Sequence, residues 1–268
     1  MKDLESDVGE TDSNEPNQLS QESEFSKLVQ ENKLNRTSRF LAQEIDLKRV
    51  DVQLTILGLA TGILDAMTFP DLSVFVSNQT GNTVLLAVGI SKDSFVRIDT
   101  TITSLSCFMA GSFCFGQAAN RIGRKRRGWL VFSNLTQSFL VLISGILVYT
   151  KAVELSRGHR SANIPTALMA FGSGGQVAMA RALCQDIPTA MVTSAYVDLF
   201  ADPDLFKLHN VARNRRIVFI ICLFVGSLIG AYTHDISAGL PMMLTFCMKF
   251  LISWSFLMNP VSKTEDGV

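Results

Sequence analysis

A carboxylate and a polar turn interrupt the first apolar stretch of the chain. Asp65 lies within an apolar run, and the segment 75–82, Phe-Val-Ser-Asn-Gln-Thr-Gly-Asn, follows closely. A charged side chain at bilayer depth costs at least about 2.5 kcal/mol, and irregular backbone is tolerated there only against protein or water. Amide and hydroxyl groups on a bent backbone can hold an ion or a small polar solute. The pattern therefore predicts a membrane-embedded binding site made by Asp65, Asn78, Thr80, Gly81 and Asn82.

A structural role is the alternative for each part of this motif. Asp65 could instead cap a broken helix ahead of Pro70, and the turn could be a packing loop closed by asparagine hydrogen bonds. Lys249, a cation within the last apolar run, is a candidate partner for Asp65. A lysine in such a position can also extend toward the membrane interface, so this pairing is one of two interpretations.

A weak internal repeat points to a second polar region. At an offset of about 112 residues, Gly62-Ile-Leu-Asp65 meets Gly174-Gly-Gln-Val177. With one residue inserted, Thr80-Gly-Asn82 meets Thr193-Ser-Ala195. Inverted repeats with interrupted helices in matching places indicate a midplane site in secondary transporters. The residues predicted to face the first motif are Gln176, Thr189 and Thr193.

Two charges bracket the end of the fourth apolar run. Arg181 and Asp186 could form a salt-bridged gate, or they could simply mark the membrane interface.

Six apolar runs are long enough to cross a bilayer, which needs about 20 residues. They are Val52–Phe69, Thr100–Ala119, Trp129–Tyr149, Ile164–Leu183, Ile217–Tyr232 and Leu240–Leu257. Two further segments, Leu72–Ile90 and Ile187–Phe200, look broken or re-entrant. We therefore predict an all-α, multi-pass transmembrane helix bundle. It has six spans, or seven if residues 72–90 cross, in two inverted three-span halves.

Basic residues set the predicted orientation, because Lys and Arg in short loops stay on the cytoplasmic side. Clusters precede the first span, separate the second from the third (Arg121 to Arg127) and precede the fifth. Six crossings place all three on one side, with both termini cytoplasmic. Residues 1–50, with 11 acids and 7 bases, are predicted to be a disordered or loosely helical tail. The transmembrane domain is predicted at 51–258, followed by a short cytoplasmic tail at 259–268.

These motifs resemble the YoaK-like family of integral membrane proteins, catalogued as a domain of unknown function. The resemblance is carried by Gly62 to Ala66, Phe75 to Thr83 and, more loosely, Gly174 to Ala178 with Thr189 to Leu199. It extends over about Val52 to Leu257. This chain departs from the family pattern at Val177, where the family shows Asn, and at Ser194, where it shows Gly. The resemblance implies a six- or seven-span membrane protein and supplies no established activity.

Other chemistries find little support. His159, His209 and His234 are scattered without metal-ligand spacing, and no nucleophile and base pair is apparent, so we expect no metal, no cofactor and no enzyme activity. The run Arg124 to Arg127 fits topology and anionic lipids better than nucleic acid. We predict an integral membrane transporter of an unidentified small solute or ion, with the lipid bilayer as its surroundings. A non-transporting scaffold or accessory subunit is the alternative. Which membrane it occupies, and whether it forms a homo-oligomer, stay open.

Overall fold

The structure is a computed structural model that describes residues 35–91, 96–156 and 159–262. The chain divides into two units, with the boundary between Ala42 and Gln43. In the first unit, residues 35–42 form a helix. All further observations concern the second unit.

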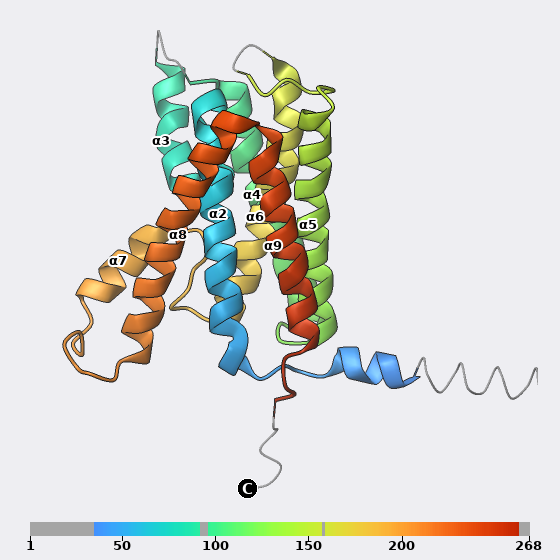
Figure 1. The fold of residues 1–268 in the computed structure, drawn as a ribbon, viewed down its shortest axis with the longest axis vertical. Coiled ribbons are helices and arrows are strands. Elements are labelled where there is room, and N and C mark those ends of the chain that lie inside the picture. Colours follow the sequence, from blue (N-terminus) through green and yellow to red (C-terminus); the bar gives the residue numbers. More distant parts are fainter. Residues whose placement is uncertain (1–34, 92–95, 157–158, 263–268) are drawn as a thin grey trace, which may run out of the picture. The chain divides into compact units, whose positions relative to one another are not determined.

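The second unit is a bundle of helices connected by loops (Figure 1). Within the described residues it contains isolated bridges and no strand. Its elements are η1 (Leu47–Arg49), α2 (Val50–Leu72), α3 (Gln79–Ile90), α4 (Ile98–Ile122), α5 (Arg127–Tyr149), η2 (Arg160–Ala162), α6 (Asn163–Leu183), α7 (Val192–Phe200), α8 (Val211–Ile236) and α9 (Gly239–Leu257). This confirms the predicted all-α, multi-pass class.

Five helices of the described chain are long and apolar enough to cross a membrane, namely α2 with the preceding turn, α4, α5, α8 and α9. The sixth predicted span is α6, whose 21 residues are rich in Gly, Ala, Ser and Thr and therefore less apolar. At 1.5 Å per residue α6 is about 32 Å long, which matches the hydrocarbon thickness. It packs against α4 and α5, so protein rather than lipid covers much of its surface.

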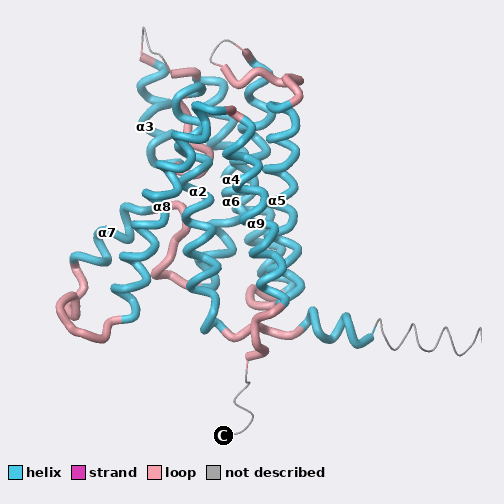
Figure 2. The backbone as a smooth tube through the Cα atoms, in the orientation of Figure 1, coloured by secondary structure: helices cyan, strands magenta, loops and turns pink. Residues whose placement is uncertain are grey.

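The two segments predicted to be broken are short helices preceded by irregular chain. α3 has 12 residues and α7 has 9, and both are too short to cross a bilayer. α2 continues through Pro70, one turn beyond the predicted end of the span, and stops at Ser73 in a left-handed conformation (φ 52°). The chain between α6 and α7 is likewise a loop, seen in pink in Figure 2.

Both ends of the second unit meet the turn between α4 and α5. Ile45 forms a bridge with Val261, and Glu44 forms one with Arg126. Ile45 is only 1% exposed, so the chain is already packed against the bundle before residue 50. The predicted tail of residues 1–50 therefore differs from the structure at residues 43–50; residues 1–34 lie outside the described chain.

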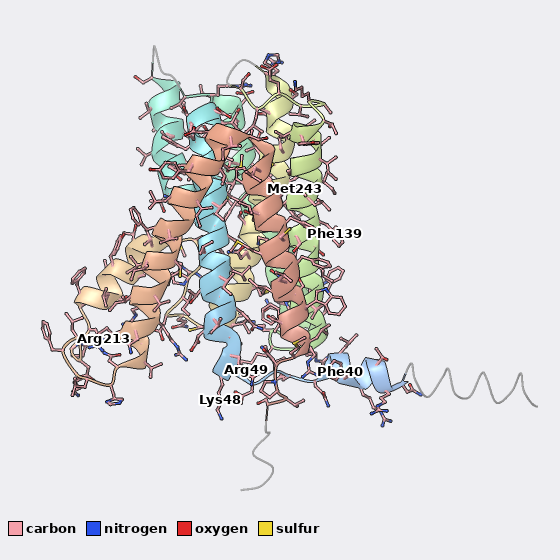
Figure 3. All side chains as sticks on the ribbon, viewed as in Figure 1. Phe40, Lys48, Arg49, Phe139, Arg213 and Met243 are labelled. Carbon is pink, nitrogen blue, oxygen red and sulfur yellow. The ribbon has the colours of Figure 1, made fainter. Side chains whose placement is uncertain are left out.

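One end of the bundle gathers the basic residues and is called the basic end here. It carries the start of α2, the turn between α4 and α5, the start of α8 and the end of α9. Lys48, Arg49 and Arg213 all lie there in Figure 3. Two long helices separate each of these segments from the next, counting α6 as a span, so the chain returns to the same end each time. The predicted six-span topology requires this arrangement. The orientation of the basic end toward the cytoplasm stays a prediction.

Two pairs of helices run parallel in close contact. α2 packs on α8, and α4 packs on α6. Glycines allow this approach: a Cβ at Gly62 would lie 2.2 Å from the Leu223 carbonyl oxygen, and one at Gly111 would lie 2.0 Å from that of Phe171. Small residues at such contacts let helix backbones pack closely where lipid supplies no hydrophobic drive.

We predict opposite effects for two alanine substitutions in α4. Gly111→Ala forces the α4 and α6 backbones apart and should lower the free energy of unfolding by about 1–3 kcal/mol. Gly116→Ala is the matched control, because nothing lies within 4 Å of the added Cβ. It should be neutral or stabilising by up to about 1 kcal/mol. Thermal unfolding in detergent measures both, and equal melting temperatures would contradict the close packing.

Candidate functional site

The carboxylate of Asp65 binds the backbone that follows α2. Its Oδ1 accepts hydrogen bonds from the amides of Val76 and Ser77, both at 2.9 Å. Its Oδ2 accepts one from the Ser77 hydroxyl at 2.5 Å. These charge-assisted bonds satisfy the anion and hold the irregular segment 73–78 against α2. The contacts of Asp65 are those of a structural residue.

The side-chain amide of Asn82 forms hydrogen bonds with the backbone of the same segment. Its Oδ1 accepts from the Phe75 amide at 2.9 Å, and its Nδ2 donates to the Phe75 carbonyl oxygen at 2.6 Å. The Ser104 hydroxyl of α4 also donates to that carbonyl, at 2.7 Å. Asn78 caps α3, because its Oδ1 accepts from the Gly81 amide. The predicted turn is therefore closed by asparagine hydrogen bonds.

The remaining threonines of the two motifs do not gather at one place. Thr80 of α3 and Thr193 of α7 are exposed. Thr189, in the loop before α7, is buried with φ 58°, and its hydroxyl has no hydrogen-bond partner in the described chain. Of the second-half residues, Gln176 alone joins the centre of the bundle described next.

A buried polar cluster lies where α2, α5, α6 and α9 meet, and we call it the central polar layer. It consists of Thr61, Gln137, Gln176 and Lys249, all less than 5% exposed. The Lys249 ammonium group donates to Gln137 Oε1 at 3.0 Å and to Gln176 Oε1. Gln176 Nε2 in turn donates to Thr61 Oγ1 at 2.8 Å. The layer connects four helices through their side chains.

The central polar layer separates two apolar clusters. Toward the basic end, Leu57 of α2 and Ile252 of α9 belong to the first cluster. Toward the opposite end, Leu64 of α2 and Met242 of α9 belong to the second. Thr61 and Lys249 lie between these positions on the same two helices. The lysine is therefore near mid-depth, where apolar side chains close it off from both ends.

The predicted ion pair between Asp65 and Lys249 does not form. Asp65 uses both oxygens on the loop after α2, and Lys249 donates to two glutamine oxygens. The sequence singles out Lys249, because a cation inside an apolar run is unusual. Gln137 was missed, since a single glutamine in the third span carries no pattern of its own. The feature of the sequence that points to Gln137 is a mostly polar run in α5, Ser133-Asn-Leu-Thr-Gln137, in a helix otherwise rich in apolar residues.

The predicted gate between Arg181 and Asp186 is also absent. Arg181 is exposed and contacts the Met191 sulfur. Asp186 instead binds two arginines of α8, with Arg216 Nη2 at 2.8 Å and Arg215 Nη1 at 3.5 Å. Asp186 therefore pairs with two cations of α8 and not with Arg181 of its own neighbouring helix.

These arginines extend an ion-pair network across the basic end. Arg215 Nε also binds Asp51 of α2 at 2.7 Å, and Arg216 Nη1 binds Asp202 at 3.2 Å. The backbone amide of Asp204 donates to Asp202 and holds the pKa of that carboxyl below its usual range. Asp202 therefore stays ionised at neutral pH, and the network joins the start of α2 to the loop between α7 and α8.

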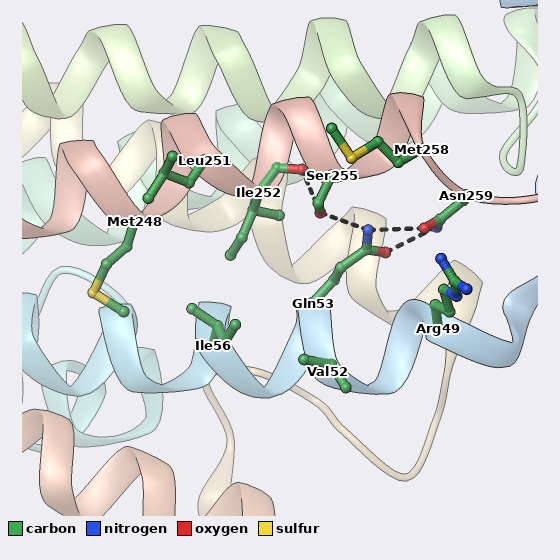
Figure 4. A pocket seen from close by; sticks show the side chains of 10 residues that line it. All are labelled: Arg49, Val52, Gln53, Ile56, Met248, Leu251, Ile252, Ser255, Met258 and Asn259. Carbon is green, nitrogen blue, oxygen red and sulfur yellow. Dashed lines mark hydrogen bonds between the residues drawn. The ribbon is translucent and has the colours of Figure 1, made fainter.

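A groove of about 590 Å³ runs between α2 and α9 near the basic end (Figure 4). Val52, Leu251 and Met258 line it and are each more than 60% exposed, so the groove lies on the outer face of the bundle. Its polar floor is closed, because Gln53 Nε2 donates to Ser255 Oγ at 2.6 Å and to Asn259 Oδ1 at 3.1 Å. In a membrane, acyl chains cover such a surface.

Fold and polar layer together define a multi-pass, α-helical membrane protein. The chain belongs to the family described as protein of unknown function (DUF1275), whose sequence profile matches residues 53–255. It is 27% identical over 155 residues to the UPF0700 transmembrane protein YoaK of Bacillus subtilis (strain 168). That match covers 56% of this chain and 65% of YoaK, less than two thirds of its length. No solved structure matches the chain. The resemblance to the YoaK-like family is confirmed.

The contacts of Asp65 generate a prediction about stability. Asp65→Asn removes the charge, which weakens the hydrogen bonds that Oδ1 accepts from the amides of residues 76 and 77, and it replaces Oδ2, the acceptor of the Ser77 hydroxyl, with an NH2 donor. We expect the free energy of unfolding to fall by about 1–3 kcal/mol. Asp198→Asn is the control, because the exposed Asp198 carboxylate makes no hydrogen bond within the described chain. Thermal unfolding in detergent compares the two, and an unchanged Asp65→Asn protein would refute the structural role.

Proposed function

We propose that this protein transports a small solute or ion and that the central polar layer is its binding site. The observation that carries the proposal is Lys249, which is 3% exposed between two apolar clusters. Among the described residues no carboxylate forms an ion pair with it. A lysine at the centre of a membrane helix costs about 2.5–3.5 kcal/mol, and such residues mark substrate or ion pathways. Methionine would fill the same space without that cost, which favours a role beyond packing.

The arrangement of the helices supports the same proposal. α2 and α8 run in one direction, and α4 and α6 run in the other. Gly62 of α2 approaches Ser227 of α8, and in the same way Gly174 of α6 approaches Ser112 of α4. We treat α2 to α5 and α6 to α9 as an inverted repeat, with the short helices α3 and α7 in matching places. Inverted repeats with broken helices are typical of secondary transporters, whose sites lie at the interface of the repeats.

The two apolar clusters supply the barriers that transport needs. Each cluster closes one side of the layer, so the layer reaches water on a given side only when that cluster separates. Opening one cluster at a time gives alternating access around a fixed site. In this scheme Asp65 and the turn of residues 75–82 shape the bundle, and Lys249 with its two glutamines contacts the solute.

A non-transporting scaffold or accessory subunit is the second candidate. The observation that favours it is the polar turn, in which Asp65 and Asn82 are used entirely on backbone and neighbouring side chains. A scaffold needs such a turn for stability alone. It does not need an isolated cation at mid-depth, and for that reason we prefer transport.

Uptake by liposomes containing the full chain tests the proposal. The assay uses a panel of radiolabelled anions, cations and neutral polar solutes, compared with empty liposomes. We expect at least one solute to enter, and Lys249→Met to slow its entry about 10- to 100-fold. That range corresponds to the loss of a hydrogen bond to a charged group, about 1.5–3 kcal/mol.

Lys125→Met is the matched control, because Lys125 is exposed in the turn after α4 and its ammonium group makes no hydrogen bond or ion pair within the described chain. It should take up solute at the wild-type rate. Thermal unfolding shows whether Lys249→Met is folded. Uptake no greater than that of empty liposomes, or equal uptake by folded Lys249→Met and wild type, would count against transport through this layer.

A further inference from the structure

The hydrogen bonds of Lys249 are incomplete in its charged form. A lysine ammonium group carries three N–H donors. Gln137 Oε1 and Gln176 Oε1 accept two of them, and the third makes no hydrogen bond within the described chain. Both acceptors are neutral amides, so the positive charge is hydrogen-bonded but not neutralised. A buried charge of this kind is stable only when it is paired.

A second donor without a partner lies one turn away on the same helix. Thr245 is fully buried, and its hydroxyl has no hydrogen-bond partner in the part of the chain that the structure describes. Several other buried helix threonines donate to the carbonyl four residues earlier, as Thr61 does to Leu57 and Thr166 does to Ala162. Thr245 does not, so its hydroxyl remains available for another acceptor.

Thr245 and Lys249 leave α9 on the same face, because residues four apart in a helix are neighbours. One N–H and one O–H are thus left over on one face of α9. The remaining Lys249 N–H can only donate, the Thr245 hydroxyl can donate as well as accept, and the ammonium form of Lys249 is positively charged. A ligand that completes the site supplies an acceptor and a negative charge.

We infer that the solute held by the central polar layer is a small monovalent anion, bound by Lys249 and Thr245. This inference rests on the proposed function and specifies its substrate class. One negative charge cancels the one positive charge of Lys249, and a neutral pair is buried at far lower cost than an isolated charge. The apolar clusters on both sides of the layer restrict the ligand to a small one.

Anion binding by the purified protein is the direct test. The melting temperature is measured in sodium chloride, nitrate or formate, with sodium gluconate as a larger reference anion. A ligand that binds only the folded state raises the melting temperature with its concentration. We expect at least one of the three anions to do so for the wild type and for Lys125→Met. The rise should be absent in Lys249→Met.

Thr245→Val removes the hydroxyl at nearly constant volume and should weaken the same anion about tenfold. Thr166→Val is its control, because that buried hydroxyl already donates to a backbone carbonyl. This comparison does not depend on Lys249→Met being folded. Equal anion affinity in the Thr245→Val and wild-type proteins would remove Thr245 from the site.

Uptake measurements separate failure of this inference from failure of the proposed function. If no anion stabilises the protein but a neutral or cationic solute enters in a Lys249-dependent way, transport stands and the anion assignment is overturned. A neutral Lys249 amine, whose two N–H groups match the two glutamine oxygens, would explain that result. If anions bind but no solute enters, the site stands and transport fails. If nothing binds and nothing enters, both are wrong.

Discussion

The bilayer supplies no hydrogen-bond partners, and this constraint governs every polar group in the core of the bundle. The protein satisfies most of them internally: Asp65 and Asn82 complete the broken backbone after α2, and Gln137 and Gln176 receive two donors from Lys249. The side chains of Asp65 and Asn82 have all their polar atoms paired, whereas the Lys249 ammonium group has an unused donor. A polar region whose hydrogen-bonding groups are all paired fits a structural role, whereas one with an unused donor can bind a ligand.

The glycine contacts hold α8 against α2 and α4 against α6, and α2 and α6 each contribute one residue to the central polar layer. Gly62 brings the backbone of α2 against α8, and on another face of α2 Thr61 meets Gln176 of α6 at the depth of Lys249. Apolar side chains above and below then exclude water from that depth. Small residues thus pack the parallel pairs closely, and the two apolar clusters isolate Lys249.

The sequence was sufficient for the helices and insufficient for the site. All six predicted spans are helices, because long apolar runs leave a chain in lipid few alternatives. The sequence favours Asp65 as a site residue. The groups that face its carboxylate depend on the path of the following residues up to Ser77, and hydropathy does not predict that path. The partners of Lys249 come from spans three and four, far away in sequence. The Asp186 ion pairs were missed for the same reason, since Arg215 and Arg216 approach from a later helix.

The bridge between Ile45 and Val261 has a consequence for biogenesis. The first segment of the bundle pairs with the last described residues, and Arg127 is held by the Asn259 carbonyl oxygen at 2.7 Å. These contacts cannot form until the ribosome has released the C-terminal helix. Insertion of the early spans therefore precedes closure, and a nascent chain stalled before α9 would expose Gln137 and Gln176 without their lysine. Quality-control proteases that recognise polar groups in lipid could distinguish such an unfinished chain from the complete one.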